Sequence, residues 1–562
     1  RGYTYWDVTS PVFIKEGVLC IPTVFVSYNG EALDRKEPLL KSLEVLSKYA
    51  TKVVNKLGDK KVKSCDISVG LEQEYFLIDK KYFDARVDLK LCGRTLFGAP
   101  ATKGQELDDH YFGAIPLRVK AFMKEVNEEL WKLGIYAKTE HNEVAPAQFE
   151  LAPVFSGGNI AVDQNLLIMD VLKKVADKHG FACLLHEKPF DGINGSGKHN
   201  NYSIVTDDGQ NLFDPGRKPM DNIRFLTFTC AFIEAVDTYP VLLRLAASSA
   251  GNDFRLGANE APPAIISIYL GSYIEDILYS LHSGKRKKEG EVVDSSFEPV
   301  KNISYIPHDN TDRNRTSPVA FTGNKFEFRM LGSSMNASFA NTVLNTIIAN
   351  SLKKISEELD TCKTVEEVRE KALEICKKIT PAYLAAQLPL LQNAQVVVAD
   401  TNLPEESLQY LADNCTVPLF IDPVSTVKAK KIAPILSKIH TLKPNRLELL
   451  SGVKIESRED LDKAADALMK MGLHRMFISL GADGVYAAMG DKRAILPNLP
   501  GHMVNTTGCG DAFMAAIVWA YLEGMDLEHT ALAGLAAGSI AMESAETINS
   551  AMSASGVQSR MR

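Results

Sequence analysis

The sequence predicts two fold classes in succession: α+β over residues 1–375 and α/β with a parallel sheet over residues 380–556. Two observations support this prediction. The first region mixes strands, isolated helices and long loops rich in glycine, asparagine and proline, which is typical of α+β domains. The second region alternates short apolar strands with helices, which is the βαβ pattern of a parallel sheet. A short tail is predicted over residues 557–562.

Each element of the first region is predicted from its hydrophobic period. Residues 67–77 alternate like a strand, whereas residues 159–178 and 338–359 have the pattern of amphipathic helices. Loops are predicted over residues 191–201 and 307–318. Because loops this long inside a compact domain are usually functional or disordered, we expect functional residues in or near them.

The second region is predicted from four short apolar segments with helices between them, such as the helix at residues 460–471. The predicted strands are residues 394–399, 417–422, 440–443 and 475–480. A charged helical stretch, residues 365–378, leads into this region without a linker rich in proline, glycine or serine. That junction is unusual, because independent domains usually meet at a flexible linker.

Length and composition indicate a globular protein with a modest negative charge. The chain has 562 residues, of which 45% are hydrophobic, and a formal net charge of -7. At about 100–200 residues per domain, three or more domains are expected. The charge gives no reason to expect nucleic acid or a membrane surface as a partner, and no apolar run approaches the roughly 20 residues of a membrane span. Nine cysteines without a CxxC pair fit a reducing cytoplasm. Because the chain opens with Arg1, we expect its true N-terminus to be missing.

Four carboxylates and one histidine form the first candidate site. Glu72 and Glu74 are two residues apart on the predicted strand, so both lie on one face. The pair alone is better explained as a solvated face. Glu143 and Glu150 flank the segment NEVAPAQFE, and His199 follows in NGSGKHNN. Divalent cations such as Mg²⁺ prefer oxygen ligands, so the larger set favours a metal site.

Charged residues also alternate along residues 325–329, KFEFR. Lys325, Glu327 and Arg329 lie on one face of this predicted strand, and Phe326 and Phe328 lie on the other. Cations on both sides of a carboxylate are awkward in a core strand. This arrangement favours a site that holds metal and phosphate together.

Residues 192–198, GINGSGK, are close to a P-loop. A P-loop requires Ser or Thr at the next position, where its hydroxyl binds Mg²⁺, but this chain has His199 there. We therefore interpret Lys198 as a loop lysine. His199 alone would more often be a structural histidine than a ligand, and only the carboxylates that accompany it favour metal binding.

These segments, taken in order, resemble the glutamine synthetase family, and type III in particular. The resemblance is carried by TYWDVTSPVFIKEG, NEVAPAQFELAP, FRLGANEAPPAIIS and DRNRTSPVAFTGNKFEFR, and it covers residues 1 to about 375. It implies the α+β catalytic domain of that family, which ligates ammonia to glutamate with ATP through a γ-glutamyl phosphate. It also implies two bound Mg²⁺ or Mn²⁺ ions and, for intact relatives, a dodecameric ring.

The resemblance assigns a role to each matching residue. It implies one metal held by Glu74, Glu143 and Glu150, and a second held by Glu72, His199 and Glu327. It implies glutamate binding by Asn194, Gly195, Arg255 and Arg329, and cofactor binding by Arg315, Lys325 and Ser203. Glu260 matches the flap carboxylate that takes a proton from bound ammonium.

The chain also departs from this family. Ala320 occupies a position where the family commonly has another arginine, and Lys325 stands where it usually has Arg. The resemblance further implies that the N-terminal β-grasp domain and the C-terminal tail are missing.

A glycine-rich segment, residues 505–513 (NTTGCGDAF), forms the second candidate site. Gly508 and Gly510 let backbone N–H groups converge where a helix is predicted over residues 512–522, and a helix N-terminus favours an anion. Asp511 is a candidate general base for a hydroxyl. The alternative interpretation is a plain helix cap, because Asp is favoured at that position.

This segment resembles the anion hole of the PfkB (ribokinase-like) carbohydrate kinases, with Cys509 in place of alanine. In KPNRLE, Asn445 and Glu448 match the family's magnesium and phosphate positions, and Gly481 in SLGADG matches its nucleotide turn. The segments DTNLPEE, DPVSTVKA and HTLKPNRLE are most similar to pseudouridine kinases. The resemblance covers about residues 380–556 and only the C-terminal half of such a kinase.

Three functions remain open from the sequence. The first is a ligase that makes glutamine from glutamate, ammonium and ATP. The second is a kinase that phosphorylates pseudouridine or a related nucleoside. The third is an inactive chimera of two gene fragments, because both resemblances stop at the same junction.

Overall fold

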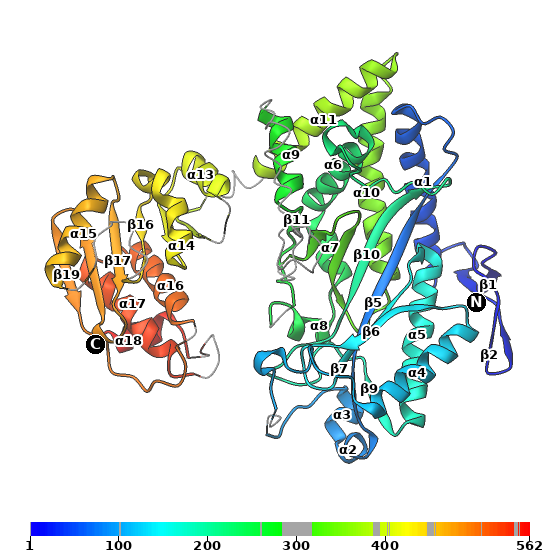
Figure 1. The fold of residues 1–562 in the computed structure, drawn as a ribbon, viewed down its shortest axis with the longest axis horizontal. Coiled ribbons are helices and arrows are strands. Elements are labelled where there is room, and N and C mark those ends of the chain that lie inside the picture. Colours follow the sequence, from blue (N-terminus) through cyan, green and yellow to red (C-terminus); the bar gives the residue numbers. More distant parts are fainter. Residues whose placement is uncertain are drawn as a thin grey trace, which may run out of the picture. The chain divides into compact units, whose positions relative to one another are not determined.

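The computed structural model describes residues 2–99, 103–258, 261–283, 317–385, 394–401, 405–446, 457–506, 508–544 and 551–562, together with residues 403, 455 and 549. The chain forms two compact units, Arg1–Tyr383 (unit 1) and Leu384–Arg562 (unit 2) (Figure 1). Among the described residues, no single helix is long and apolar enough to span a membrane. Within these residues, the helices α6 (Ile223–Thr238) and α7 (Pro240–Ala246) together have the length and apolar composition of a membrane span, but they are bent by 80° relative to each other.

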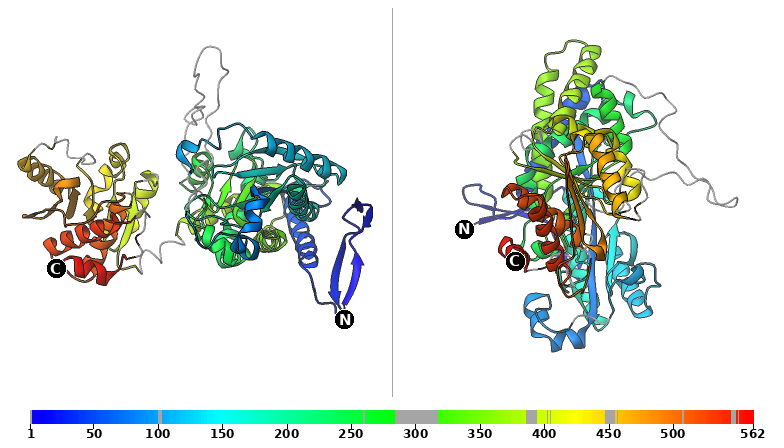
Figure 2. Two further views of the ribbon diagram at one scale, coloured as in Figure 1. Left: turned by 90° about the horizontal axis from the view of Figure 1, so that it is seen from below. Right: turned by 90° about the vertical axis from the view of Figure 1, so that its left-hand side faces the viewer.

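Unit 1 begins with two small antiparallel sheets. Strand β1 (Gly2–Trp6) pairs with β4 (Thr23–Ser27), and β2 (Phe13–Lys15) pairs with β3 (Val18–Cys20). Figure 2 shows these dark-blue strands beside the N-terminus. The segment between β1 and β2 contains Asp7. Asn159 of α5 (Gly158–Lys178) holds this segment against the helix, because its side-chain amide donates to the Asp7 carboxylate at 2.7 Å.

A nine-stranded sheet forms the centre of unit 1, in the order β11-β12-β13-β10-β5-β7-β6, with β8 and β9 also paired to β5. Its long central strands β5 and β10 run antiparallel, side by side (Figure 1). The strands are β5 (Cys65–Asp79), β6 (Ala137–Asn142), β7 (Gln148–Pro153), β8 (Ser156–Gly157), β9 (Phe181–Leu184), β10 (Gly197–Thr206), β11 (Ile268–Tyr269), β12 (Val319–Phe321) and β13 (Phe326–Gly332).

Helices cover one face of this sheet, which we call the helix face. Val69 of β5, Tyr202 of β10 and Phe328 of β13 point into a core shared with α1, α6, α10 and α11.

The helices of unit 1 as a whole are α1 (Lys36–Lys56), α2 (Lys80–Ala85), α3 (Val87–Cys92), α4 (Leu117–Lys132), α5 (Gly158–Lys178), α6 (Ile223–Thr238), α7 (Pro240–Ala246), α8 (Ala250–Arg255), α9 (Ser272–Ser283), α10 (Ser338–Leu359) and α11 (Val365–Ala385), with 3₁₀ turns η1 (Glu106–Asp108) and η2 (Pro219–Asp221).

The periodic segments of unit 1 adopt the predicted structures. The helix predicted at residues 338–359 is α10, that at 159–178 is α5, and the strand predicted at 67–77 lies within β5. The loop predicted over residues 191–201 is wrong in its second half, because β10 begins at Gly197. Its glycines and asparagines indicate a loop, but pairing with β5 on one side and β13 on the other overrides that local preference.

Unit 2 contains one six-stranded sheet in sequence order, β14 to β19. The first four strands are parallel, as predicted, but β18 and β19 are antiparallel hairpin strands that the sequence analysis did not assign. The strands are β14 (Val397–Asp400), β15 (Leu419–Asp422), β16 (Thr441–Leu442), β17 (Arg475–Ser479), β18 (Val485–Met489) and β19 (Lys492–Leu496). Together they match the predicted α/β class with an antiparallel edge added.

The helices of unit 2 pack on this sheet around separate apolar cores. The helices are α13 (Glu405–Asn414), α14 (Thr426–Ala429), α15 (Arg458–Lys470), α16 (Cys509–Leu522), α17 (Leu527–Ala541) and α18 (Ala554–Arg560), with 3₁₀ turns η3 (Lys430–Lys438) and η4 (Gly481–Asp483). Helix α18 reaches into the predicted tail as far as Arg560. Val557 is buried there, and Arg560 pairs with Glu543 at 2.8 Å.

Candidate functional site

Three of the predicted metal ligands meet on the face of the unit 1 sheet opposite the helix face, which we call the site face. His199 of β10 lies directly opposite Glu72 of β5 in register, and Glu327 comes from β13 on the other side of β10. The Nδ1 atom of His199 lies 3.0 Å from Glu72 Oε2 and 2.9 Å from Glu327 Oε1. One ligand atom from each residue lies within 4.8 Å of the others, as a metal site requires.

The electrostatics of this cluster are those of an imidazolium between two carboxylates. Burial by itself would lower the pKa of His199, but hydrogen bonds to Glu327 and Glu72 outweigh it and raise that pKa to about 10. Burial opposes ionisation of Glu72 and Glu327, yet the same imidazolium holds the pKa of both carboxyls below the ordinary value. A bound cation would replace the proton, because metal binding competes with protons for such ligands.

The other predicted ligand set lies on neighbouring strands. Glu74 of β5 is directly opposite Glu150 of β7, and Glu143 follows β6. The group whose ligand atoms lie within 4.8 Å of one another consists of Glu143, Glu150 and His141. Glu74 lies between the two groups, with its Oε1 4.0 Å from Nε2 of His199.

His141 is a site residue that the sequence analysis missed. Its Nε2 lies 3.2 Å from Glu150 Oε1, and that hydrogen bond raises the pKa of His141 to about 9. Burial raises the pKa of Glu150, although its hydrogen bond with His141 opposes that shift. One signal in the sequence could have found His141. It lies two residues before Glu143, and residues two apart in an extended segment share a face.

The predicted glutamate loop closes this part of the site. Asn194 and Gly195 precede β10, and the N–H of Gly197 donates to Glu74 Oε2 at 2.7 Å. Glycines at positions 195 and 197 let this segment run close to Arg255: an ideal Cβ on Gly197 would lie 2.1 Å from Nη2 of Arg255. Arg255, only 3% exposed, ends α8 and donates to the carbonyls of residues 329 and 331.

A cavity of about 20 Å³ joins these parts, and its lining includes both predicted metal ligands and predicted substrate residues. It is lined by Glu74, Glu143, Gln148, Asn194, Gly195, His199, Arg255 and Ala261. The convergence of carboxylates, an imidazole and a buried guanidinium makes this small cavity the candidate active centre.

Arg329, Lys325 and Ser203 lie along the same face of the sheet. The guanidinium of Arg329 donates to Glu327 Oε2 at 3.2 Å and is buried. Lys325 donates to the Asn201 side chain, and Ser203 is two residues further along β10. The predicted cofactor residues therefore line a path that leads along β10 away from the metal ligands.

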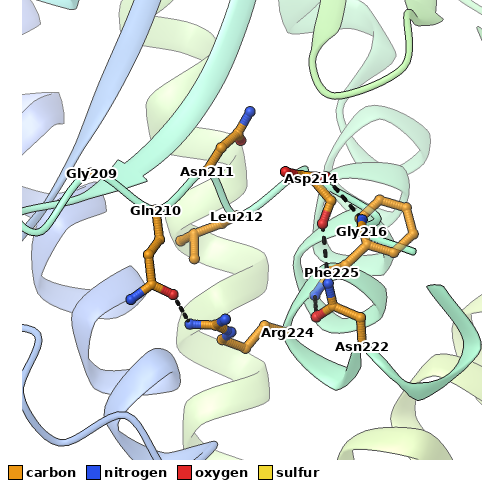
Figure 3. A pocket seen from close by; sticks show the side chains of 9 residues that line it. All are labelled: Gly209, Gln210, Asn211, Leu212, Asp214, Gly216, Asn222, Arg224 and Phe225. Carbon is orange, nitrogen blue, oxygen red and sulfur yellow. Dashed lines mark hydrogen bonds between the residues drawn. The ribbon is translucent and has the colours of Figure 1, made fainter. Parts of the chain in front are cut away.

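A larger cavity of about 340 Å³ lies at the far end of β10 (Figure 3). Its walls come from the loop after β10 and the start of α6, and in Figure 3 Gln210 and Arg224 point toward each other. Asn211 connects this cavity to the path along β10, because it accepts a hydrogen bond from the Ser203 hydroxyl. The cavity contains none of the predicted metal ligands, so its size alone does not make it the reaction centre.

Three predicted residues lie outside the described part of the chain. They are Glu260, Arg315 and Glu448.

In unit 2, the carboxyl ends of the parallel strands carry a polar cluster. Asp422 ends β15, and Lys443, just after β16, places its Nζ 2.7 Å from Asp422 Oδ2. The sequence analysis quoted the KPNRLE segment but did not single out its lysine. Ligands of open α/β sheets bind outside this edge.

The glycine-rich turn lies near that lysine. Gly508 has φ +84°, a conformation that favours glycine, and is the N-cap residue immediately before α16. An ideal Cβ on Gly510 would lie 3.2 Å from Nζ of Lys443, and Asp511 is exposed in the first turn of α16. The predicted kinase base thus lies in the first turn of a helix, one residue after the glycine that approaches Lys443.

The other described kinase positions also lie at this edge. Asn445 bridges Ser479 at the end of β17, and Gly481, with φ +64°, begins the turn η4.

The donor set of unit 1 fits a divalent cation. Carboxylate oxygens with one imidazole per group suit Mg²⁺ or Mn²⁺. Glu150 Oε2 is buried and has no hydrogen-bond partner in the described part of the chain. A buried carboxylate oxygen in this state is costly unless something binds it.

Different segments of the chain match the models of different protein families. Residues 1–42 match the family "glutamine synthetase type III N terminal", residues 48–234 match "glutamine synthetase, catalytic domain", and residues 330–554 match "pfkB family carbohydrate kinase". The first segment, which the sequence analysis included in the catalytic domain, thus carries N-terminal-domain sequence. The kinase match begins inside unit 1, although residues of α10 and α11 bury their apolar faces in the unit 1 core.

Three curated relatives illustrate the similarity. The chain is 44% identical over 467 residues to a type-3 glutamine synthetase of Dictyostelium discoideum, covering 82% of this chain and 61% of the relative. It is 58% identical over 327 residues to a glutamine synthetase of Butyrivibrio fibrisolvens, covering 58% and 46%. It is 38% identical over 190 residues to a pseudouridine kinase of Escherichia coli (strain K12), covering 33% and 60%.

The chain thus spans 46% to 61% of the length of these relatives. Fold and site define one unit with carboxylate–histidine groups on a mainly antiparallel sheet, and another with a glycine turn and a lysine at the edge of a sheet whose first four strands are parallel. Residues 1–42 and 48–234 are thus similar to the type III glutamine synthetases, and residues 330–554 are similar to the pfkB family carbohydrate kinases.

Proposed function

We propose that unit 1 ligates ammonia to glutamate with ATP and forms glutamine through a γ-glutamyl phosphate. One observation carries this proposal: a single cavity is lined by members of both ligand groups, by the Asn194–Gly195 loop and by Arg255. A site for metal, phosphate and an amino acid needs these parts together.

The chemistry explains why each part is needed. A carboxylate is a poor electrophile, so the γ-carboxylate of glutamate must first be phosphorylated, and phosphoryl transfer depends on positioning and charge neutralisation. Bound Mg²⁺ or Mn²⁺ would supply Lewis-acid neutralisation of the phosphate charge. The cations of Arg255 and Arg329, both buried, would hold the carboxylates of glutamate or its acyl phosphate.

The remaining residues act on the nucleotide and on the nucleophile. Lys325 and Ser203, with Arg315, would hold the nucleotide along β10, beyond the ligand groups. Glu260 would take a proton from bound ammonium, because ammonia and not ammonium is the nucleophile.

The test of this proposal is Glu327→Ala, assayed by ATP-dependent formation of γ-glutamyl hydroxamate. Glu327 contacts both His199 and Arg329, and its removal should reduce the rate of hydroxamate formation by about 100-fold or more. Removing a group that only supports a metal ligand already costs about 10–100-fold, and loss of a ligand itself should cost at least as much. Glu129→Ala on α4 is the matched control and should keep the rate, because it removes a carboxylate that pairs with Lys132 far from the ligand groups in sequence. Undiminished activity of Glu327→Ala would overturn the metal assignment.

We propose, as a second activity, that unit 2 contributes to the phosphorylation of pseudouridine or a related nucleoside by ATP. The proposal is supported by the glycine turn at the start of α16, where Gly510 approaches Lys443. Asp511, in the first turn of this helix, would act as the base. Asn445 and Glu448 would act on magnesium and phosphate. Asp511→Asn should abolish nucleoside phosphorylation and leave hydroxamate formation unchanged.

The organisation of the chain is also a proposal. We infer family segments at residues 1–375 and 380–556, a homo-oligomer and a cytoplasmic location, the last supported by nine free cysteines. The competing proposal is an inactive chimera. Sequencing source DNA and transcript across codons 360–385 decides between them, because two separate genes would rule out a natural fusion.

A further inference from the structure

Two polar side chains lie directly behind the proposed metal ligands, on the helix face of the sheet. Gln73 lies between Glu72 and Glu74 on β5, and Lys198 precedes His199 on β10. They are opposite each other in register, and because alternate residues point to opposite faces, both point away from the ligands. Both are 0% exposed.

The ammonium group of Lys198 has an unusual environment. It donates to the Ser333 carbonyl and lies 3.1 Å from Sδ of Met169. Within the described ranges, no carboxylate lies within salt-bridge distance of it. Burying an ammonium without a counter-ion is costly, and an apolar side chain would fill the same space at lower cost. This position also separates Lys198 from any phosphate on the site face, which excludes the P-loop role.

Ser333, in the turn after β13, connects the segments that carry the ligands. Its carbonyl accepts from Lys198 and from Nε2 of Gln73 at 3.1 Å, and its hydroxyl donates to the Glu74 carbonyl at 2.6 Å. Its N–H donates to the Ser196 carbonyl at 3.2 Å, inside the glutamate loop. One fully buried residue thus bonds to β5, to β10 and to the loop.

Glu187 holds the same loop and turn from another side. Its carbonyl accepts from the N–H of Ser196 at 2.8 Å, and its carboxylate accepts from the N–H of Ser334 at 3.1 Å. Loop and turn are therefore bonded to each other and to a common third residue, so one cannot shift without the other.

We propose that Lys198, Gln73 and Ser333 are positioning residues that hold the metal-ligating strands and the glutamate loop in one register from behind. The inference rests on the proposed function of unit 1. Buried polar groups that support metal ligands typically change metal affinity by about 10–100-fold when removed. Loss of the Lys198 amino group would leave the Ser333 carbonyl with the Gln73 amide as its remaining side-chain donor in the described part of the chain.

Calorimetric titration of the full chain with Mn²⁺ alone tests this inference, with thermal unfolding of each variant as a check of folding. Lys198→Met keeps the length of the side chain and removes its ammonium. Asn345→Leu is the matched control, because it also replaces a fully buried polar residue behind β10, where Asn345 accepts from the Tyr202 hydroxyl at 2.8 Å. We expect the dissociation constant to rise about 10–100-fold for Lys198→Met and less than about 3-fold for Asn345→Leu.

Equal affinities of wild type and Lys198→Met, or equal losses in both variants, would overturn the positioning role. If Lys198→Met does not fold, Ser333→Ala, which deletes one hydroxyl, is judged by the same criterion. Failure of the wild-type chain to bind Mn²⁺ at all would instead overturn the proposed function, and the inference with it.

Discussion

Gly195 shows how single residues limit the site. An ideal Cβ at this position would lie 2.2 Å from the Glu187 carbonyl oxygen and 3.2 Å from Cγ of Arg255. Because the first contact is with backbone, the loop and not a side chain must move. Gly195→Ala should therefore lower the free energy of unfolding of unit 1 by about 1–3 kcal/mol.

Thermal or urea unfolding measures this effect. Gly70→Ala on β5 is the control, because its Cβ would approach other atoms no closer than 3.6 Å. A Gly195→Ala variant as stable as Gly70→Ala would show that the loop relaxes freely.

At the same scale, one of the two groups of side chains expected from the resemblance is found together in the structure, and the other contains a residue that was not expected. Glu72, His199 and Glu327 were expected together and are together, because each lies at the register position that faces the site. His141 was missed, since its spacing from Glu143 is a weak signal until strand pairing places it opposite Glu150.

At the scale of elements, a stacked group at the starts of β15, β16 and β17 predicts a pH dependence. His440 stacks between Phe420 and His474, with centroids 5.5 Å and 4.6 Å away, and Arg475 lies on Phe420. Burial lowers the pKa of His440 to about 4, and the charges of Arg475 and His474 act in the same direction. The ordinary pKa of about 6.5 applies in the unfolded chain.

Between these values the unfolded state binds more protons than the folded state, so stability falls as the pH falls. The contribution of neutral His440 should be complete above about pH 6.5 and be lost progressively toward pH 4. In calorimetry at pH 7 and pH 5, His440→Phe should show a smaller fall in the melting temperature of unit 2 than wild type. Equal falls would exclude His440 as the group responsible.

The long periodic elements of unit 1 and the four parallel strands of unit 2 were predicted, but the hairpin at the edge of the unit 2 sheet was not. Helix α10 has the predicted bounds because 22 residues repeat one apolar face. Strands β18 and β19, of five residues each, were not assigned, and nothing in so short a pattern shows whether a strand runs parallel or antiparallel to its neighbour.

At the scale of the whole molecule, each unit contains its own apolar cores. The largest core of unit 1 includes Leu352 and ends at Cys376, whereas Leu468 belongs to a core made only of residues from Val397 onward. Because each core is closed within one unit, the units should unfold as separate transitions.

Truncating one core tests this separation. Leu468→Ala should destabilise unit 2 by about 2–5 kcal/mol, and Leu352→Ala should do the same to unit 1. Scanning calorimetry should show one transition shifted in each variant and the other unchanged. A shift of both transitions by either variant would mean that the units unfold together.

The sequence by itself determined the order of chemistry-bearing residues and the two families that they resemble, because motifs and long periods are local properties of the chain. The tertiary structure decided which side chains meet. His199 and Glu327 are far apart in sequence, and Lys198 and His199 are adjacent yet face opposite sides of the sheet. Strand register sets both arrangements, and register depends on pairing between distant segments that no single segment encodes.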